Sequence, residues 1–324
     1  MNCPLVSVIT NSYNSVKYLR ANIESMLQQD YDNWEHIIVD CGSTDGSADL
    51  VRSMGHPRLR LCEASFCSVS EGRNIGIAES KGEIISILDS DDAALPHRLS
   101  RQVEVMVNRP DVVAVGGGII RVEERTGARK KFTYPNDHRT IMLLLETCIN
   151  PVPHSTLAFR RACFDGASFY STTMRRSEDF ELILRLARKG RLVCLAEPLA
   201  YYNYRLDSHS FRSEPGTRIE LFYALKAVLL HHSEAAGDKL SPAQVERWLE
   251  SIGPSGIRAI VGRRAFTTAM RNLGSLDVRT LVILLKTAAM HSRDIIGNLG
   301  GKWWKNAGTL ESMAMMCLNN GEAK

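Results

Sequence analysis

The sequence has few of the features that mark a zinc-binding, secreted or membrane-spanning protein. Its eight cysteines include no C-x-x-C pair, which argues against a zinc cluster or a disulfide framework and favours reduced thiols. No uncharged apolar run reaches the roughly 18 residues that a membrane-spanning helix needs. Residues 1–6 lack the charged and long apolar segments of a signal peptide, so we expect a cytoplasmic protein.

The sequence also lacks a strong excess of either charge. It has 40 Lys and Arg residues against 36 Asp and Glu residues in a chain of 324, and 44% of the chain is hydrophobic. This balance is that of a folded globular protein and gives no indication of disorder or of nucleic-acid binding. The length suffices for one large domain or two modest ones.

Short apolar runs and helical patterns alternate over the first ninety residues. Such alternation predicts an α/β fold with parallel strands and helices on both faces of the sheet. The predicted strands are residues 6–10, 36–39, 59–62 and 84–88, and the predicted helices are residues 16–29, 47–54 and 70–80.

The pattern becomes less regular after residue 90 and purely helical after residue 211. We therefore predict an α/β domain over residues 1–210 and a helical region over residues 211–324. In the first region we expect helices at 96–107, 140–148 and 177–189, strands at 112–120, within 151–161 and at 192–196, and a surface hairpin at 121–131. In the second we expect helices at 216–231, 241–251, 257–272 and 278–290.

Three carboxylates follow the predicted strand 84–88. Asp89, Asp91 and Asp92 have only Ser90 between them. Carboxylates this close repel one another, and a hard cation such as Mg²⁺ or Mn²⁺ would relieve the repulsion. Open α/β sheets bind ligands at the carboxyl ends of their strands, which favours a metal site over a solvated acidic turn.

Five segments together resemble family 2 glycosyltransferases with the GT-A fold. The resemblance covers about residues 4–210 and implies a Rossmann-like mixed sheet. It also implies a metal-dependent, inverting transfer of a sugar from a nucleotide-sugar to a hydroxyl group. The segments are S-V-I-T-N-S-Y-N at 7–14, D-C-G-S-T-D-G at 40–46, G-R-N-I-G-I-A at 72–78, D-S-D-D at 89–92 and E-D-F-E-L-I-L-R at 178–185.

The resemblance implies a nucleotide site at Asp40, Tyr13 and Asn14. Asp40 would accept a hydrogen bond from the N–H of the base, which suits uracil and hence a UDP-sugar, and Tyr13 and Asn14 would complete the pocket. The alternative is that Asp40 and Thr44 only cap the following helix. Cys41 departs from the family pattern, because many relatives have a second aspartate there.

The resemblance also assigns residues around the diphosphate. It places Arg73 beside the nucleotide, Asp89 at the ribose and Asp91 at the metal, Mn²⁺ or Mg²⁺, and it includes Ser90 among the nucleotide-binding residues. For Arg73 the alternative is an ion pair with Glu71 on the same predicted helix.

Acceptor-side residues come from later segments. By resemblance, Asp179 is the general base, although Glu178 and Asp179 also suit a helix N-terminus in any protein. Either Asp207 or His209 would complete the metal shell. His154 lies in a segment that resembles the acceptor side of the family, and a structural role for it is the alternative.

Two rival functions are less consistent with these residues. A nucleotidyltransferase would be expected to have a glycine-rich basic loop after the first strand, and residues 11–17 are not one. A catalytically silent nucleotide-sugar binder would be expected to lack the metal aspartates or the base. The expected partners are a nucleotide-sugar donor and a saccharide or lipid-linked saccharide acceptor, with no nucleic acid. The sequence does not decide whether the protein forms a homo-oligomer.

The helical region raises the question of membrane contact. It holds 15 Lys and Arg against 10 Asp and Glu residues, with the clusters Arg263-Arg264 and Lys302-Trp303-Trp304-Lys305. Tryptophans flanked by lysines suit the surface of an anionic membrane, so one hypothesis is peripheral attachment to its cytoplasmic face. The alternative is that these helices pack on protein.

Overall fold

The chain divides into two compact units in a computed structural model that describes residues 3–164, 169–205, 216–235 and 241–272, with Thr280, Leu284 and Thr287. The first unit comprises Met1–His138 and Val152–Glu214, and the second comprises Arg139–Pro151 and Pro215–Lys324. The segment Arg139–Pro151 therefore groups with the helical unit, although it precedes residue 210 in the sequence.

The first unit begins with the predicted alternation of strands and helices. Strands β2 and β4 both pair in parallel with β1, and β3 pairs in parallel with β2. The prediction of parallel strands is therefore confirmed. The elements are β1 (Val6–Ser12), α1 (Val16–Leu27), β2 (Trp34–Cys41), α2 (Ser47–Met54), β3 (Leu59–Ala64), α3 (Val69–Glu79) and β4 (Ile84–Ile87).

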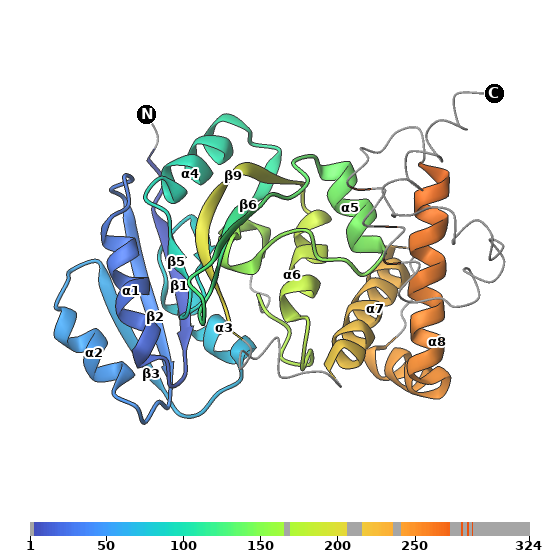
Figure 1. Ribbon diagram of the computed structural model, residues 1–324, viewed down its shortest axis with the longest axis horizontal. Coiled ribbons are helices and arrows are strands. Elements are labelled where there is room, and N and C mark those ends of the chain that lie inside the picture. Colours follow the sequence, from blue (N-terminus) through green and yellow to red (C-terminus); the bar gives the residue numbers. More distant parts are fainter. Residues whose placement is uncertain are drawn as a thin grey trace. The chain divides into compact units, whose positions relative to one another are not determined.

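The second half of this unit makes the sheet mixed. The nine strands follow the order β3-β2-β1-β4-β8-β6-β9-β5, with β7 paired to β6 (Figure 1). Because β8 runs antiparallel to both β4 and β6, the sheet has the mixed character that the resemblance implied. The elements are β5 (Ala93–Ala94), α4 (Arg98–Asn108), β6 (Val112–Glu123), β7 (Arg129–Phe132), β8 (Ala158–Arg160), α6 (Glu178–Ala187) and β9 (Arg191–Tyr204).

Helices cover both faces of the parallel strands. Val8 of β1 packs in a core cluster with Met26 of α1 and Leu99 of α4. The next residue, Ile9, points to the opposite face, where a Cβ at Gly76 of α3 would come within 2.7 Å of it. Neighbouring side chains of a strand point to opposite faces, so β1 is buried on both sides. Gly76 lets α3 approach the sheet closely.

Strand β9 differs from the prediction of a short strand at 192–196. It extends to Tyr204 because it pairs with β6 as far as Glu123, and register shifts near Gly117 and Gly118 accommodate an irregularity. Sequence periodicity is lost at such an irregularity, which explains the early predicted end. The extension brings the end of β9 to the acidic turn after β4. The predicted hairpin over 121–131 is confirmed by the pairing of β6 with β7.

The second unit is helical in its described part and contains α5 (His138–Glu146), α7 (Gly216–Ala235) and α8 (Pro242–Arg271). Helix α8 is continuous, so the prediction of separate helices at 241–251 and 257–272 is wrong. Pro254 lies inside it, where proline typically costs about 3 kcal/mol. Leu249 and Ile257, on either side of Pro254, both pack in one core cluster with Leu225 of α7, which stabilises the continuous helix.

Several predictions fall on residues that the structure does not describe. The helix at 278–290 is represented by three residues alone, and the Lys302-Trp303-Trp304-Lys305 cluster, Asp207 and His209 lie outside the described ranges. Among the helices that are described, none combines the length and apolar character needed to cross a bilayer.

Candidate active site

Asp40 lies at the carboxyl end of β2, where the sequence analysis placed the nucleotide site. It pairs in register with Ser12 at the end of β1, and Gly42 turns the chain sharply with φ of 78°. Its Oδ2 accepts a hydrogen bond from the backbone N–H of Ser43 at 2.9 Å. Its Oδ1 is buried and has no donor among the described residues. Asp40 therefore keeps one acceptor for a ligand N–H.

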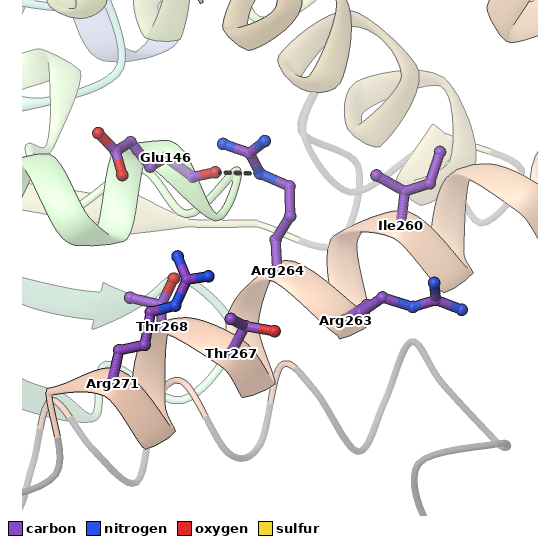
Figure 2. A pocket seen from close by; sticks show the side chains of 7 residues that line it. All are labelled: Glu146, Ile260, Arg263, Arg264, Thr267, Thr268 and Arg271. Atoms are coloured by element: carbon purple, nitrogen blue, oxygen red, sulfur yellow. Dashed lines mark hydrogen bonds between the residues drawn. The ribbon is translucent and has the colours of Figure 1, made fainter.

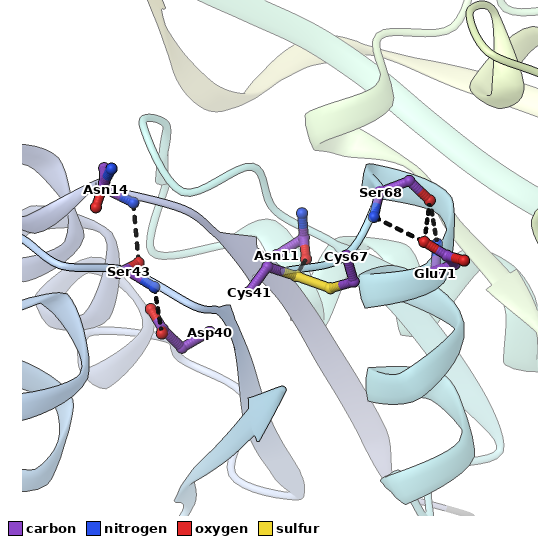
Figure 3. Close-up of a disulfide and its surroundings, with 8 residues drawn as sticks. All are labelled: Asn11, Asn14, Asp40, Cys41, Ser43, Cys67, Ser68 and Glu71. Carbon is purple, nitrogen blue, oxygen red and sulfur yellow. Dashed lines mark hydrogen bonds between the residues drawn. A yellow bond between two sulfur atoms is a disulfide. The ribbon is translucent and has the colours of Figure 1, made fainter. Parts of the chain in front are cut away.

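Two loops are held together beside Asp40. Asn14, at φ of 48°, donates its N–H to Ser43 Oγ at 2.9 Å (Figure 3). Its side-chain Oδ1 accepts from the N–H of Thr44, also at 2.9 Å. The adjacent Tyr13 is 50% exposed and contacts the 77% exposed ring of Phe66 edge-to-face. Exposed neighbouring aromatic rings are a surface on which a base can stack.

Cys41 and Cys67 form a disulfide, so the expectation of reduced thiols is wrong for this pair (Figure 3). The bond joins the end of β2 to the residue before Ser68, which caps α3 through a capping box with Glu71. The two cysteines are 26 residues apart in the sequence, so their spacing did not indicate a disulfide. Only the fold brings the end of β2 and the loop before α3 together. The other described cysteines form no disulfide with one another.

The acidic turn after β4 is fixed by side chains from elsewhere in the unit. Asn22 of α1 donates to the carbonyl oxygens of both Asp89 and Asp92 at 2.9 Å. Ser90 Oγ lies 2.9 Å from Ser15 Oγ. These contacts hold the turn in one conformation at the carboxyl edge of the sheet.

Asp92 is buried in this turn. Its Oδ1 accepts from the backbone N–H of Asn203 at 2.9 Å, and its Oδ2 has no donor among the described residues. Burial, together with the charges of Asp91 and Asp89, raises the pKa of Asp92 well above its usual range. Arg98 is also buried nearby, and desolvation lowers its pKa to about 10 although both Asp92 and Asp89 attract its charge.

Asp91 is the more accessible acid, with 25% of its side chain exposed. Its Oδ2 accepts from Arg205 Nη2 at 2.8 Å, and Asn203 donates to its backbone carbonyl. Burial and the charge of Asp89 raise the pKa of Asp91, and Arg205 opposes the shift. A partly exposed carboxylate in a crowded acidic turn is a suitable ligand for a hard cation.

The described residues do not form a complete protein cage for a metal. No group of three or more His, Cys, Asp or Glu side chains within them is arranged to hold an ion. Mg²⁺ typically uses only one or two carboxylates together with substrate phosphates and waters. Asp91 therefore fits a site that a diphosphate would complete.

Arg73 of α3 connects the acidic turn with α6. Its guanidinium donates to Asp89 Oδ1 at 2.9 Å and to Glu178 Oε1 at 2.8 Å, and it lies over the ring of Tyr170. The alternative pairing with Glu71 is not observed, because Glu71 is engaged in the capping box. Only 9% of the Arg73 side chain is exposed, so this bridge is largely shielded from water.

His154 and Ser155 complete the surroundings of Asp89. Both belong to a 3₁₀ turn at His154–Thr156. Ser155 Oγ donates to Asp89 Oδ2 at 2.8 Å, and His154 Nδ1 lies 3.5 Å from Asp89 Oδ1. Burial alone would raise the pKa of Asp89, but His154 and Arg73 hold it well below its usual range. Asp89 is therefore ionised and positioned by three neighbours.

Glu178 and Asp179 form the first turn of α6 after Ser177, which has φ of 56°. Burial raises the pKa of both acids, but at Glu178 Arg73, a backbone hydrogen bond and His154 together outweigh burial and lower the pKa. At Asp179 the charge of Glu178 adds to burial, and the pKa rises. The pKa values of the two neighbouring acids are therefore shifted in opposite directions.

Several residues of the site had no local sequence signal. Phe66 stands in an irregular loop, and Tyr170, whose hydroxyl lies 2.9 Å from His154 Nε2, stands in another. Asn203 belongs to the part of β9 beyond its predicted end. Each reaches the site through tertiary packing, so only the fold identifies it.

Comparisons with known proteins agree with this geometry. The model of the family "Glycosyl transferase family 2" matches residues 7–166. The chain is 31% identical over 216 residues to the putative glycosyltransferase EpsE of Bacillus subtilis, covering 64% of this chain and 76% of that protein.

Two solved structures share the fold. The structure of S. aureus TarS residues 1–349 in complex with UDP-GlcNAc is 16% identical, with a TM-score of 0.58, and covers 88% of this chain and 87% of that one. The structure of the mannosyltransferase PcManGT of Pyrobaculum calidifontis with GDP-Man and Mn²⁺ is 18% identical, with a TM-score of 0.51. The match covers 100% of this chain and 89% of that one. The fold, the ordered motifs and the relatives agree: this chain belongs to glycosyl transferase family 2, and it is a glycosyltransferase.

Proposed function

We propose that the protein is an inverting, metal-dependent glycosyltransferase. It transfers a sugar from a UDP-sugar to a hydroxyl group of a saccharide or lipid-linked saccharide acceptor. The observation that carries the proposal is the Arg73 bridge, which links Asp89 at the donor edge of the sheet to Glu178, the neighbour of Asp179. The acidic turn on the donor side and the helix turn that carries Asp179 are thus joined through Arg73.

The donor base binds at the end of β2. Asp40 Oδ1, which has no donor among the described residues, accepts the N–H of uracil. The exposed rings of Tyr13 and Phe66 stack on the base, and Asn14 holds the two loops that carry the site. UDP-GlcNAc in the TarS complex, a protein of the same fold, supports a uridine donor.

The diphosphate lies along the acidic turn. Asp89 contacts the ribose together with Ser90, and Asp91 would hold Mn²⁺ or Mg²⁺. When bound, the cation neutralises negative charge that develops on the departing diphosphate. Arg205, which now pairs with Asp91, can donate to a phosphate oxygen in its place. Asp207 or His209 as a further metal ligand stays a prediction.

Asp179 takes the proton from the acceptor hydroxyl. Its raised pKa makes it a better proton acceptor than an ordinary aspartate, and Arg73 keeps Glu178 ionised beside it. The hydroxyl oxygen then attacks the anomeric carbon from the side opposite the diphosphate, which inverts the configuration. A positioned base of this kind typically contributes a factor of about 10² to 10⁴.

A donor panel tests the proposal. Purified protein is incubated with Mn²⁺ or Mg²⁺ and a series of UDP-, GDP- and other nucleotide-sugars, and the released nucleotide is measured with and without saccharide and lipid-linked saccharide acceptors. We expect release of UDP from one UDP-sugar and a product of inverted anomeric configuration. Release of pyrophosphate would indicate a nucleotidyltransferase, binding without release would indicate a silent binder, and a retained configuration would exclude the inverting mechanism.

A further inference from the structure

The second unit contains a pocket on one side of α8. Its cavity volume is about 410 Å³. One lining residue, Glu146, comes from α5, and the others come from consecutive turns of α8 (Figure 2). The lining residues are Glu146, Ile260, Arg263, Arg264, Thr267, Thr268 and Arg271.

The α8 residues occupy a single face of the helix, because they recur at intervals of three and four. This face presents three guanidinium groups and the hydroxyls of Thr267 and Thr268, with Ile260 as its one apolar side chain. Five of the six side chains can donate hydrogen bonds. A lining of this composition suits a ligand rich in oxygen acceptors and offers little to an acyl chain.

Arg264 is held in place by protein contacts. Its Nε donates to the backbone carbonyl oxygen of Glu146 at 2.8 Å (Figure 2), and its Nη2 lies 3.3 Å from His232 Nε2. The carboxylate of Glu146 points away from Arg264 in this view and forms no ion pair among the residues that the structure describes. The carboxylate of Glu146 therefore does not neutralise the positive charges of the arginines in the pocket.

Arg263 and Arg271 are exposed, and within the described ranges neither side chain has a hydrogen-bond acceptor or an acidic partner. They are separated by eight residues, or about 12 Å along the helix axis, with Arg264 between them. Three like charges along this distance repel one another. A ligand with two or more negative charges would remove the repulsion.

We propose that this pocket binds a phosphate-bearing ligand, with its oxygens held by the guanidinium groups of Arg263, Arg264 and Arg271 and by the hydroxyls of Thr267 and Thr268. Guanidinium groups bind phosphate oxygens in planar, paired geometry. The ligand is a soluble diphosphate or the phosphate headgroup of a lipid, which present the same oxygens. This site is separate from the nucleotide site and goes beyond the proposed function.

Protection from arginine modification tests the site directly. The full-length protein is treated with phenylglyoxal in the presence of EDTA, with and without pyrophosphate, and modified arginines are identified by peptide mass spectrometry. We expect pyrophosphate to protect Arg263, Arg264 and Arg271. Arg247 is an internal control, since it is exposed on the same helix and does not line the pocket.

Matched variants measure the contribution of the pocket. The double substitution Arg263→Gln and Arg271→Gln should weaken pyrophosphate binding by at least about tenfold, because each lost charged hydrogen bond has that order of effect. Arg247→Gln removes one charge from the same helix and should leave binding unchanged. Both pocket arginines are exposed, so we expect the double variant to fold.

Vesicles distinguish the source of the phosphate. Co-sedimentation with phosphatidic acid vesicles that requires Arg263 and Arg271 supports a lipid headgroup, and binding of pyrophosphate alone supports a soluble ligand. The proposal is overturned if neither probe protects the pocket arginines, or if Arg247→Gln weakens binding as much as the double variant. No turnover is measured, so a failure here is distinct from a failure of the proposed function.

Discussion

Glu178 and Asp179 are neighbours in the first turn of α6, yet their pKa values shift in opposite directions. Burial raises both pKa values, but at Glu178 the guanidinium of Arg73, a backbone hydrogen bond and His154 together reverse the shift. At Asp179 the charge of Glu178 adds to the shift that burial causes. Separated pKa values allow one carboxylate to hold charge while the other exchanges a proton. The predictions below test this arrangement and its surroundings.

Asp179→Asn should lower kcat by at least about tenfold while donor affinity persists, because the amide keeps the volume but cannot accept a proton. The pKa of Asp179 is raised above the usual aspartate value of 3.8. In the wild type, activity should therefore fall as the pH drops through this raised pKa, because protonated Asp179 cannot accept a proton. This acidic limb should disappear in the residual activity of the variant. Glu181→Gln in the same turn is the control, and an unchanged kcat in Asp179→Asn would exclude the general base.

Arg73→Gln should reduce the free energy of unfolding by about 3–5 kcal/mol, because it leaves two largely buried carboxylates without their cation. Urea denaturation measures this change. Combining it with Glu178→Gln should give a loss smaller than the sum of the two single losses, since one partner of the pair is then already absent. Strictly additive losses would mean that Arg73 and Glu178 do not stabilise each other.

Asp91→Asn should weaken binding of Mn²⁺ together with UDP, because the amide lacks the charge that attracts a hard cation. Isothermal calorimetry with UDP and Mn²⁺ gives the affinity, and UDP in EDTA gives the metal-independent part. The loss should appear only when the metal is present. Glu104→Gln, an exposed acid on α4, is the control. Equal affinities of Asp91→Asn and wild type would remove Asp91 from the metal site.

Asp92 should make stability depend on pH. Its raised pKa means that the folded protein keeps a proton that the unfolded chain releases above about pH 4. The free energy of unfolding, measured in EDTA, should therefore decrease as the pH rises from the usual aspartate pKa through the raised one. Asp92→Asn should flatten this part of the curve. Identical pH curves for the two proteins would show that Asp92 is not buried as a titrating acid.

The Cys41–Cys67 bond should stabilise the first unit. It closes a loop with a sequence separation of 26, so replacing both cysteines by serine should lower the free energy of unfolding by about 3 kcal/mol. A thiol reductant should produce the same loss in the wild type and none in the double variant. Cys62→Ser, at a free thiol, is the control. An absence of any reductant effect would mean that the bond does not form in solution.

The order of strands, helices and acidic motifs could be predicted from the sequence because each depends on residues close together in the chain. Apolar runs mark the buried strands, and a parallel sheet brings their carboxyl ends to one edge, so the sequence could place both Asp40 and Asp89 at that edge. Their alignment follows from the pairing of β2 and β4 on either side of β1.

The contacts that give these residues their properties depended on the tertiary structure. Arg73 pairs with Glu178, 105 residues away, and not with Glu71 on its own helix. Leu225 packs against the side chains on both sides of Pro254, which keeps α8 continuous where local propensity predicts a break. Sequence periodicity reports which face of an element is buried. Which distant side chain meets that face is decided by packing, because ion pairs, disulfides and pKa shifts depend on distances that only the folded chain sets.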